Sequence, residues 1–137
     1  RQMCIRDSPM TETRVGSILN KRVAEKYTIS DKMWESAKRR KENYRKKGYG
    51  FGFSLFNRDS KYTSTISARY YKDGAEIWID QKNKNPRKLT PDEARKLQGF
   101  PEDFKIPVSD GQAYKQFGNA VPVPVIRAIA KRMVKYL

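Results

Sequence analysis

The sequence contains no histidine and a single cysteine, Cys4. Metal sites built on histidine and cysteine, and histidine-based catalytic triads, are therefore excluded, so no metal is expected. One cysteine cannot form an intramolecular disulfide. Long apolar runs and an apolar signal segment are also missing, so we expect no membrane partner and an intracellular, cytoplasmic location.

Acidic residues are scarce relative to basic ones. Among 137 residues, 30 are Lys or Arg and 15 are Asp or Glu, which gives a formal net charge of +15 at pH 7. This balance favours a polyanionic partner, with double-stranded DNA as the first choice. The alternative is a soluble basic protein without such a partner. The length is typical of one domain, and 37% hydrophobic residues allow a modest core.

The stretch that organises the chain is residues 87–125, which read RKLTPDEARKLQGFPEDFKIPVSDGQAYKQFGNAVPVPV. Its first half predicts a helix. Thr90 is placed as the N-cap, Pro91 as the first helical residue, and Glu93 as the third, which completes a capping box. The predicted helix ends near Gly99.

The second half predicts a tight Gly118-Asn119 corner, followed by a last helix that starts near Pro124. This helix carries a stripe of apolar residues at 3.6-residue spacing. The stripe consists of Val125, Ile126, Ile129, Ala130, Met133, Val134 and Leu137. The sequence offers few partners for so wide a stripe, so we expect an uncovered apolar face.

The two halves resemble conserved motifs of the DNA (cytosine-5) methyltransferases. Residues 87–104 resemble motif IX, with the pattern R-x-L-T-x-x-E-x-x-x-L-Q-G-F-P, and residues 114–121 (YKQFGNAV) resemble motif X, with the core Q-x-G-N-x-V. The resemblance implies transfer of a methyl group from S-adenosylmethionine to carbon 5 of cytosine in a specific duplex sequence. It also implies a place in restriction–modification or in solitary methylation.

The resemblance further implies roles for single residues. Gly118, Asn119 and Ala120 would form one wall of the cofactor pocket, with Asn119 offering polar contacts and Gly118 allowing close backbone approach. Four residues would brace the target-recognition region: Arg87, Thr90, Glu93 and Arg95. Helix capping and exposed ion pairing explain Glu93 and Arg95 equally well.

Residues 61–80 (KYTSTISARYYKDGAEIWID) predict a β-hairpin, with a turn at Lys72-Asp73-Gly74. In the family, a variable target-recognition region precedes motif IX and carries a Thr-Leu or Thr-Ile dipeptide, which Thr65-Ile66 matches. The residues expected to contact DNA are Ser64, Thr65, Ile66, Arg69, Lys72 and Arg87. Arginine to guanine and hydroxyls to base edges are the expected contacts. A hairpin that is merely stable is the alternative, and the two interpretations are compatible.

Ser30 is placed as the N-cap of a helix that reaches about Lys47 and ends at Gly48. One face holds Met33, Trp34, Ala37, Lys41 and Tyr44, and the other holds Lys38, Arg39, Arg40, Arg45 and Lys46. A solvated face and a face that contacts phosphates remain equally open for these charges. Residues 14–27 predict a short helix or an irregular connector, and residues 48–56 predict a strand that passes close to another backbone or to DNA.

The fold class expected is α+β. Residues 1–9 show no periodicity, and the string MCIRDS resembles adapter read-through in assembled metagenomic DNA, so we expect a non-native tail. Residues 10–86 are expected to form a hairpin-rich target-recognition region with flanking helices, and residues 87–104 the motif IX helix. Residues 105–137 hold motif X and a carboxy-terminal helix that belongs with an α/β catalytic domain missing from this sequence.

The catalytic motifs of the family are not in the sequence. Cys4 follows Met3 rather than a proline, and neither E-N-V nor F-x-G-x-G after a first strand occurs. We therefore expect a carboxy-terminal fragment of a single-chain methyltransferase, inactive alone, whose partner is the amino-terminal catalytic domain. The small subunit of a split methyltransferase is one alternative. The other is a stand-alone basic DNA-binding module, in which a pocket-like exposure at Gly118-Asn119 would have no use.

Overall fold

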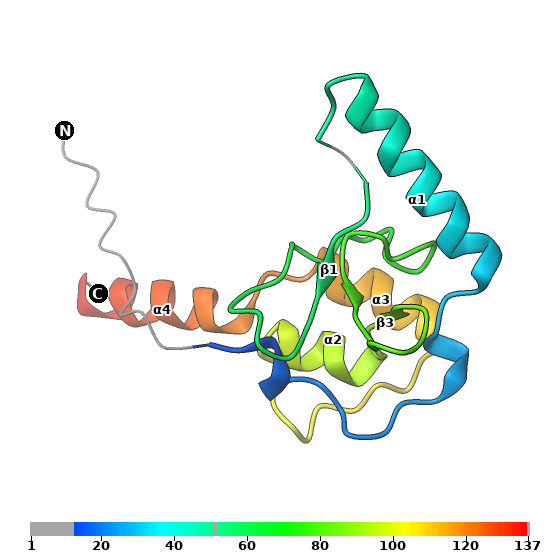
Figure 1. Cartoon of the computed structure of the whole chain (residues 1–137). Coiled ribbons are helices and arrows are strands. Elements are labelled where there is room, and N and C mark those ends of the chain that lie inside the picture. Colours follow the sequence, from blue (N-terminus) through cyan, green and yellow to red (C-terminus); the bar gives the residue numbers. More distant parts are fainter. Residues whose placement is uncertain (1–12, 51, 137) are drawn as a thin grey trace.

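The computed structural model describes residues 13–50 and 52–136, and Figure 1 shows the chain. The helices are α1 (Asp31–Lys46), α2 (Pro91–Leu97), α3 (Asp110–Asn119) and α4 (Val123–Met133). Short 3-10 helices span Val15–Ser17, Glu25–Tyr27 and Val134–Tyr136. The strands are β1 (Leu55–Phe56), β2 (Trp78–Ile79) and β3 (Arg87–Lys88). The expected non-native tail, residues 1–9, lies outside the described residues.

The strands form a small mixed sheet in the order β1-β2-β3. β1 pairs parallel to β2, and β2 pairs antiparallel to β3, with Trp78 opposite Lys88. The sheet therefore joins the segment that follows α1 to the beginning of the motif IX segment. Helices and strands together make an α+β arrangement.

The β-hairpin predicted over residues 61–80 is wrong. Residues 61–67 contain no strand, Tyr70 closes a turn by donating its N–H to the Ser67 carbonyl at 3.0 Å, and only Trp78–Ile79 forms a strand. The physical reason is Tyr70, whose side chain is fully buried. Its hydroxyl donates to the Ile77 carbonyl at 2.7 Å and accepts from the Leu89 N–H at 2.8 Å. Tertiary packing of this residue overrides the strand propensity of the alternating threonines.

The main core lies between α2, α3 and the loop that replaces the hairpin. Its buried members are Val15, Leu19, Ile66, Tyr70, Ile77, Ile79, Leu89, Ala94, Ala113, Tyr114 and Phe117. The rings of Tyr70 and Tyr114 meet edge to face, with centroids 5.1 Å apart. Residues 61–77, which we call the recognition loop after the role that the sequence predicts for them, thus share one apolar cluster with residues of the motif IX and motif X segments.

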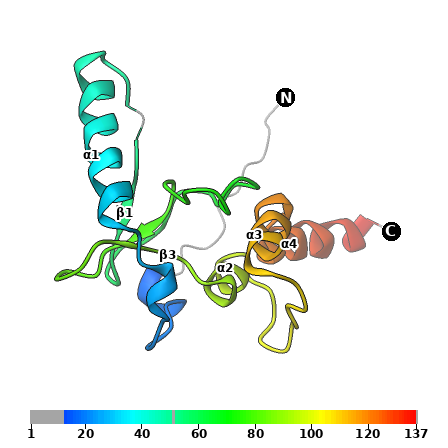
Figure 2. The ribbon, with the colours of Figure 1, turned by 90° about the vertical axis from the view of Figure 1, so that its right-hand side faces the viewer.

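α1 begins and ends as the sequence predicts. The Ser30 hydroxyl accepts from the Met33 N–H, and Gly48 follows the helix with φ 75°, in the left-handed region that favours glycine. The first turns pack on a second cluster, in which Trp34 lies 4.8 Å from Phe53 and 6.0 Å from Trp78 between ring centroids. The rest of α1 projects away from the body (Figures 1 and 2).

The tight Gly118-Asn119 corner is also wrong, because both residues lie in the last turn of α3. This helix was not predicted. Its N-cap is Ser109, whose hydroxyl accepts from the Gln112 N–H. Its buried residues Ala113, Tyr114 and Phe117 follow helical spacing, a signal that the sequence analysis did not use.

α4 has an uncovered apolar face, as the sequence predicts. The helix is described over its full length, from Val123 to Met133, and contains no buried residue. Val125, Ile126 and Ile129 are about half exposed, and Met133 is 61% exposed. Figure 1 shows α4 extending from the body on the side away from α1.

We expect Tyr70→Phe to lower the free energy of unfolding by about 1–3 kcal/mol, because the Leu89 N–H and the Ile77 carbonyl both lose their buried partner. Urea unfolding followed by circular dichroism measures the change. The matched control is Tyr71→Phe, at a residue that is 45% exposed, where a change of about 0.5 kcal/mol or less is expected. Equal effects of the two substitutions would contradict the role assigned to the Tyr70 hydroxyl.

Candidate nucleic-acid interface

The Glu93 carboxylate is the centre of the motif IX segment. It is fully buried, and it accepts hydrogen bonds from both terminal guanidinium nitrogens of Arg87, Nη1 and Nη2, at 2.8 Å each. The backbone N–H groups of Thr90 and Asn20 donate to it as well, each at 2.8 Å. The Thr90 hydroxyl in turn accepts from the Glu93 N–H, which completes the predicted capping box. One carboxylate therefore joins a helix cap, a bidentate ion pair and a distant loop.

The alternative of exposed ion pairing for Glu93 and Arg95 is wrong. Arg95 is 4% exposed, and its guanidinium binds the Asp92 carboxylate and donates to the carbonyls of Phe100 and Pro101. Because these carbonyls follow the end of α2, Arg95 fixes the turn at the end of motif IX. The bracing expected of this residue is an internal contact of the motif.

Gln98 connects motif IX to motif X. Its side-chain amide donates to the Phe117 carbonyl at 2.6 Å and to the Ala120 carbonyl at 3.3 Å, at the end of α3. Its backbone carbonyl accepts from the Val123 N–H at 2.9 Å, at the start of α4. Sequence analysis did not single out Gln98, although it stands in the L-Q-G-F-P part of the motif.

Gly118 lies directly against the recognition loop. A Cβ atom added at this position would stand 2.2 Å from the Ser67 carbonyl oxygen and 2.4 Å from the Ala68 nitrogen. No side chain fits there, so the close backbone approach expected at Gly118 is made to the chain itself. Asn119 is exposed and Ala120 is partly exposed. Gly118 is partly exposed as well, so all three predicted cofactor-wall residues keep some accessible surface.

The residues predicted to contact DNA fall into two groups. Thr65, Arg69 and Lys72 are exposed and Ser64 is partly exposed, all on the loop that replaces the hairpin. Ile66 is 2% exposed and belongs to the core, and Arg87 is 6% exposed and paired with Glu93. The structure therefore brings four of the six residues to one accessible loop and places the other two beneath it.

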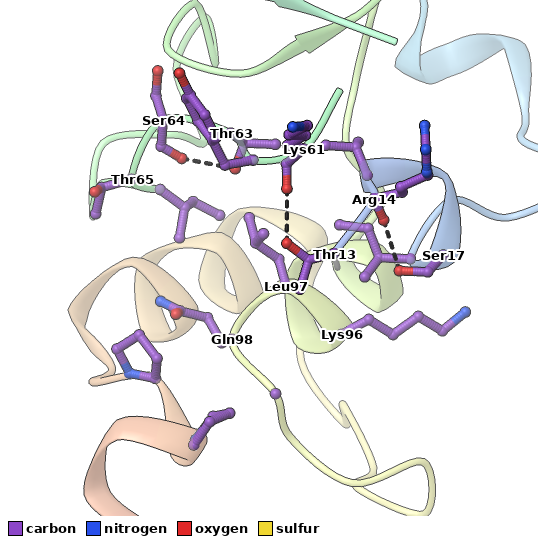
Figure 3. Close-up of a pocket in the computed structure, with 17 residues that line it drawn as sticks. Thr13, Arg14, Ser17, Lys61, Thr63, Ser64, Thr65, Lys96, Leu97 and Gln98 are labelled. Carbon is purple, nitrogen blue, oxygen red and sulfur yellow. Dashed lines mark hydrogen bonds between the residues drawn. The ribbon is translucent and has the colours of Figure 1, made fainter. Parts of the chain in front are cut away.

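A cleft of about 450 Å³ opens beside this loop (Figure 3). One side is formed by residues 61–66, another by residues 13–18, and the floor by the end of α2 and the prolines 122 and 124. The Thr13 hydroxyl donates to the Lys61 carbonyl at 2.9 Å and ties two of these segments together. Asn119 and Ala120 do not line the cleft. Sequence analysis missed it because four distant segments build it.

Two buried hydroxyls and the amino group of a half-buried lysine hold the loop in place. Burial raises the pKa of Tyr70 and of Tyr114 well above the usual range, so both hydroxyls remain protonated donors. Tyr114 donates to the Leu89 carbonyl at 2.5 Å. Burial lowers the pKa of Lys88, whose amino group donates to the Lys72 carbonyl at 2.7 Å. The backbone around Lys72 is therefore anchored while its side chain stays exposed.

Residues 13–50 and 52–136 contain neither a candidate metal site nor a candidate membrane span. In these ranges no three His, Cys, Asp or Glu side chains gather into a group that could hold a metal ion. Nor does any helix there combine the length and the apolar character needed to cross a membrane.

Comparison with known proteins identifies the family. The profile of the C-5 cytosine-specific DNA methylases matches residues 3–135, and the chain therefore belongs to this family. The resemblance carried by the two motifs is thus confirmed. The family acts on DNA, which agrees with the strongly basic composition.

Two bacterial methyltransferases illustrate the sequence similarity. The chain is 64% identical over 131 residues to the Type II methyltransferase M1.ScrFI of Lactococcus lactis subsp. cremoris, covering 95% of this chain and 34% of the relative. It is 39% identical over 145 residues to the DNA-cytosine methyltransferase of Escherichia coli (strain K12), covering 90% of this chain and 31% of the relative. The chain thus spans about a third of the length of these relatives.

Solved structures share the fold. The Entamoeba histolytica methyltransferase EhMeth superposes with a TM-score of 0.69 at 25% identity, over 89% of this chain and 40% of that one. The Schizosaccharomyces methyltransferase described as S. pombe Dnmt2 superposes with a TM-score of 0.75 at 16% identity, over 93% and 43%. At that identity the second likeness speaks for the fold alone.

We expect Glu93→Gln to lower the free energy of unfolding by about 3–5 kcal/mol, because it leaves the buried Arg87 guanidinium without its counter-charge. Urea unfolding measures the loss. The control is Glu102→Gln, the same change at an exposed residue, which should be nearly neutral. A small effect at Glu93 would show that the ion pair does not hold motif IX together.

We expect Gly118→Ala to destabilise the protein by about 1–3 kcal/mol, because the new methyl group overlaps the Ser67–Ala68 peptide. Gly111→Ala is the matched control in the same helix, since a Cβ atom there meets nothing within 4 Å. It should raise stability by up to about 1 kcal/mol. Thermal unfolding of the two variants compares them directly, and an equal response would exclude the close contact at Gly118.

Proposed function

We propose that this chain supplies the target-recognition region and one wall of the cofactor pocket of a DNA (cytosine-5) methyltransferase. The observation that carries the proposal is the contact of Gly118 with the Ser67–Ala68 peptide. It places the segment that resembles motif X against the loop that holds the Thr65-Ile66 dipeptide. DNA recognition and cofactor binding would therefore meet at one junction.

The DNA-contacting residues in this proposal are the accessible ones on the loop: Ser64, Thr65, Arg69 and Lys72. A guanidinium can bind guanine in the major groove through two hydrogen bonds, and hydroxyls can bind base edges or phosphates. Ile66 and Arg87 act from beneath the loop instead. Ile66 anchors it in the core, and Arg87 positions the end of β3 through Glu93.

This chain would form one wall of the S-adenosylmethionine pocket, not the complete pocket. Asn119 and Ala120 are accessible beside the end of α3, so the Asn119 amide can form polar contacts with a ligand. Gly118 is partly exposed beside them, and its missing side chain is what allows the Ser67–Ala68 peptide to lie against α3. When bound, the cofactor would supply the methyl group. The remaining walls would come from a catalytic region that this sequence does not contain.

The catalytic region is the proposed partner of α4. The uncovered apolar residues of α4 need a surface of comparable apolar character, and a large α/β domain would offer one. The same region would supply the nucleophilic cysteine and the E-N-V glutamate, so we propose that the chain alone is inactive. As the relatives are Type II methyltransferases, a role in restriction–modification on cytoplasmic DNA belongs to the proposal.

The test is a chimera in which this chain replaces the matching 131 residues of the Lactococcus M1.ScrFI methyltransferase. We expect tritium from labelled S-adenosylmethionine to enter duplex DNA. The relative without that segment, and this chain alone, should incorporate none. Co-expression of the two parts as separate chains tests the arrangement of a split enzyme.

An inactive but folded chimera, combined with DNA binding by the chain alone, would overturn the proposal in favour of a stand-alone binding module. Circular dichroism and gel filtration establish that the chimera is folded. Tritium incorporation by the chain alone would refute the proposed need for a separate catalytic region.

A further inference from the structure

α1 carries a row of basic residues that form no ion pair with the described part of the chain. Lys32, Arg39 and Lys46 are exposed and follow one another at seven-residue spacing, which places them along one side of the helix. Within residues 13–50 and 52–136, no ion pair involves any of the three. We call these three residues the α1 basic row.

The other charges of α1 are largely compensated. Lys38 pairs with Glu35 at 2.5 Å, Arg45 with Glu42 at 3.3 Å, and Arg40 with Asp73 at 3.7 Å. The amino group of Lys41 donates to the Phe53 carbonyl at 3.1 Å. Of the four basic side chains of α1 that form no ion pair with the described residues, three make up the basic row and the fourth is Lys41.

The packing of α1 leaves the basic row exposed and uses the opposite side of the helix. The helix is described in full, and Ala37 is its only buried residue. The Trp34, Phe53 and Trp78 rings clamp the side opposite the row, and further along, the Lys41 side chain packs closely on Gly52. Beyond its packed first turns, the 16-residue helix thus projects into solvent (Figure 2). Burial of a core does not explain a helix so placed.

We propose that α1 is an arm that binds the phosphate backbone of duplex DNA beside the target site, through the α1 basic row. This inference rests on the proposed function, because the recognition loop would bring the duplex to the arm. Fourteen residues of helix separate Lys32 from Lys46, a length of about 21 Å. One DNA strand carries about six phosphates over that length, so three long side chains can each reach one.

Charge chemistry selects DNA over a membrane surface for this face. An amphipathic membrane helix inserts apolar side chains beside its lysines and arginines. The neighbours of the basic row on its helix face are all polar: Ser36 and Asn43 on one side, and on the other Glu35 and Glu42, which pair with Lys38 and Arg45. The contacts proposed are to phosphates and are independent of the base sequence. They add affinity, while the recognition loop supplies the choice of target.

The test measures how salt weakens binding of the chain to a duplex without the target sequence. The variant combines Lys32→Gln, Arg39→Gln and Lys46→Gln, which keeps helix propensity and removes three charges. The logarithm of the binding constant falls with the logarithm of the salt concentration with a slope of about −0.9 per phosphate contact. We expect the variant to lose about 2.7 from the magnitude of that slope. The wild type then loses about 40-fold more affinity than the variant between 50 and 200 mM salt.

The matched control combines Lys21→Gln, Lys105→Gln and Lys115→Gln, which removes the same charge from exposed residues outside α1. Its slope should remain close to that of the wild type. Circular dichroism of both variants establishes that their helices are intact. In the chimera, the preference for target over non-target duplex should be unchanged by the α1 variant.

Four outcomes would overturn the assignment of α1. An unchanged slope in the α1 variant, with DNA binding retained, leaves the proposed function intact and removes the arm. Equal losses in the α1 and control variants mean that diffuse charge, not α1, binds the backbone. Loss of binding to vesicles of anionic lipid without loss of binding to DNA assigns the row to a membrane instead. Absence of duplex binding by the wild type at any salt concentration overturns the arm and the proposed function together.

Discussion

The fully buried carboxylate of Glu93 is the interaction on which the arrangement of this chain depends. A charge removed from water is stable only when opposite charge and hydrogen-bond donors surround it. Here the donors come from Arg87 before the helix, from the cap of the helix itself, and from Asn20, more than seventy residues earlier in the chain. The carboxylate therefore fixes the helix start, the end of β3 and a distant loop relative to one another.

From this centre, polar contacts extend to both functional segments. On one side, the backbone of Leu89 is held by the hydroxyls of Tyr70 and Tyr114, so the recognition loop and α3 meet the same residue. On the other, Gln98 holds the end of α3 and the start of α4. Gly118 then allows the backbone of the loop to lie on α3. The motif IX segment is a frame that sets the recognition loop against the motif X segment.

Two surfaces of opposite chemistry extend from this frame. α4 offers an apolar face on one side of the body, and α1 offers a basic row on the other (Figures 1 and 2). The recognition loop lies between them. In the functions proposed, the apolar face binds a catalytic region by excluding water, and the basic row binds phosphates by releasing counterions. A duplex held at the loop would then be contacted by the catalytic region on one side and by the α1 basic row on the other.

Local chemistry in the sequence determined the elements whose ends depend on neighbouring residues. Ser30 and Gly48 bound α1, and Thr90, Pro91 and Glu93 start α2, because caps and left-handed glycines act within a few residues. The apolar stripe of α4 could also be predicted from the sequence, and the residue patterns of motifs IX and X identified the family. Tertiary structure decided the rest. Burial of Tyr70 turned an expected hairpin into a loop, and burial of Ala113, Tyr114 and Phe117 accompanies a helix that includes Gly118, where a corner was expected. Burial likewise made Ile66 and Arg87 supports of the loop, because long-range packing selects which polar and apolar groups leave water.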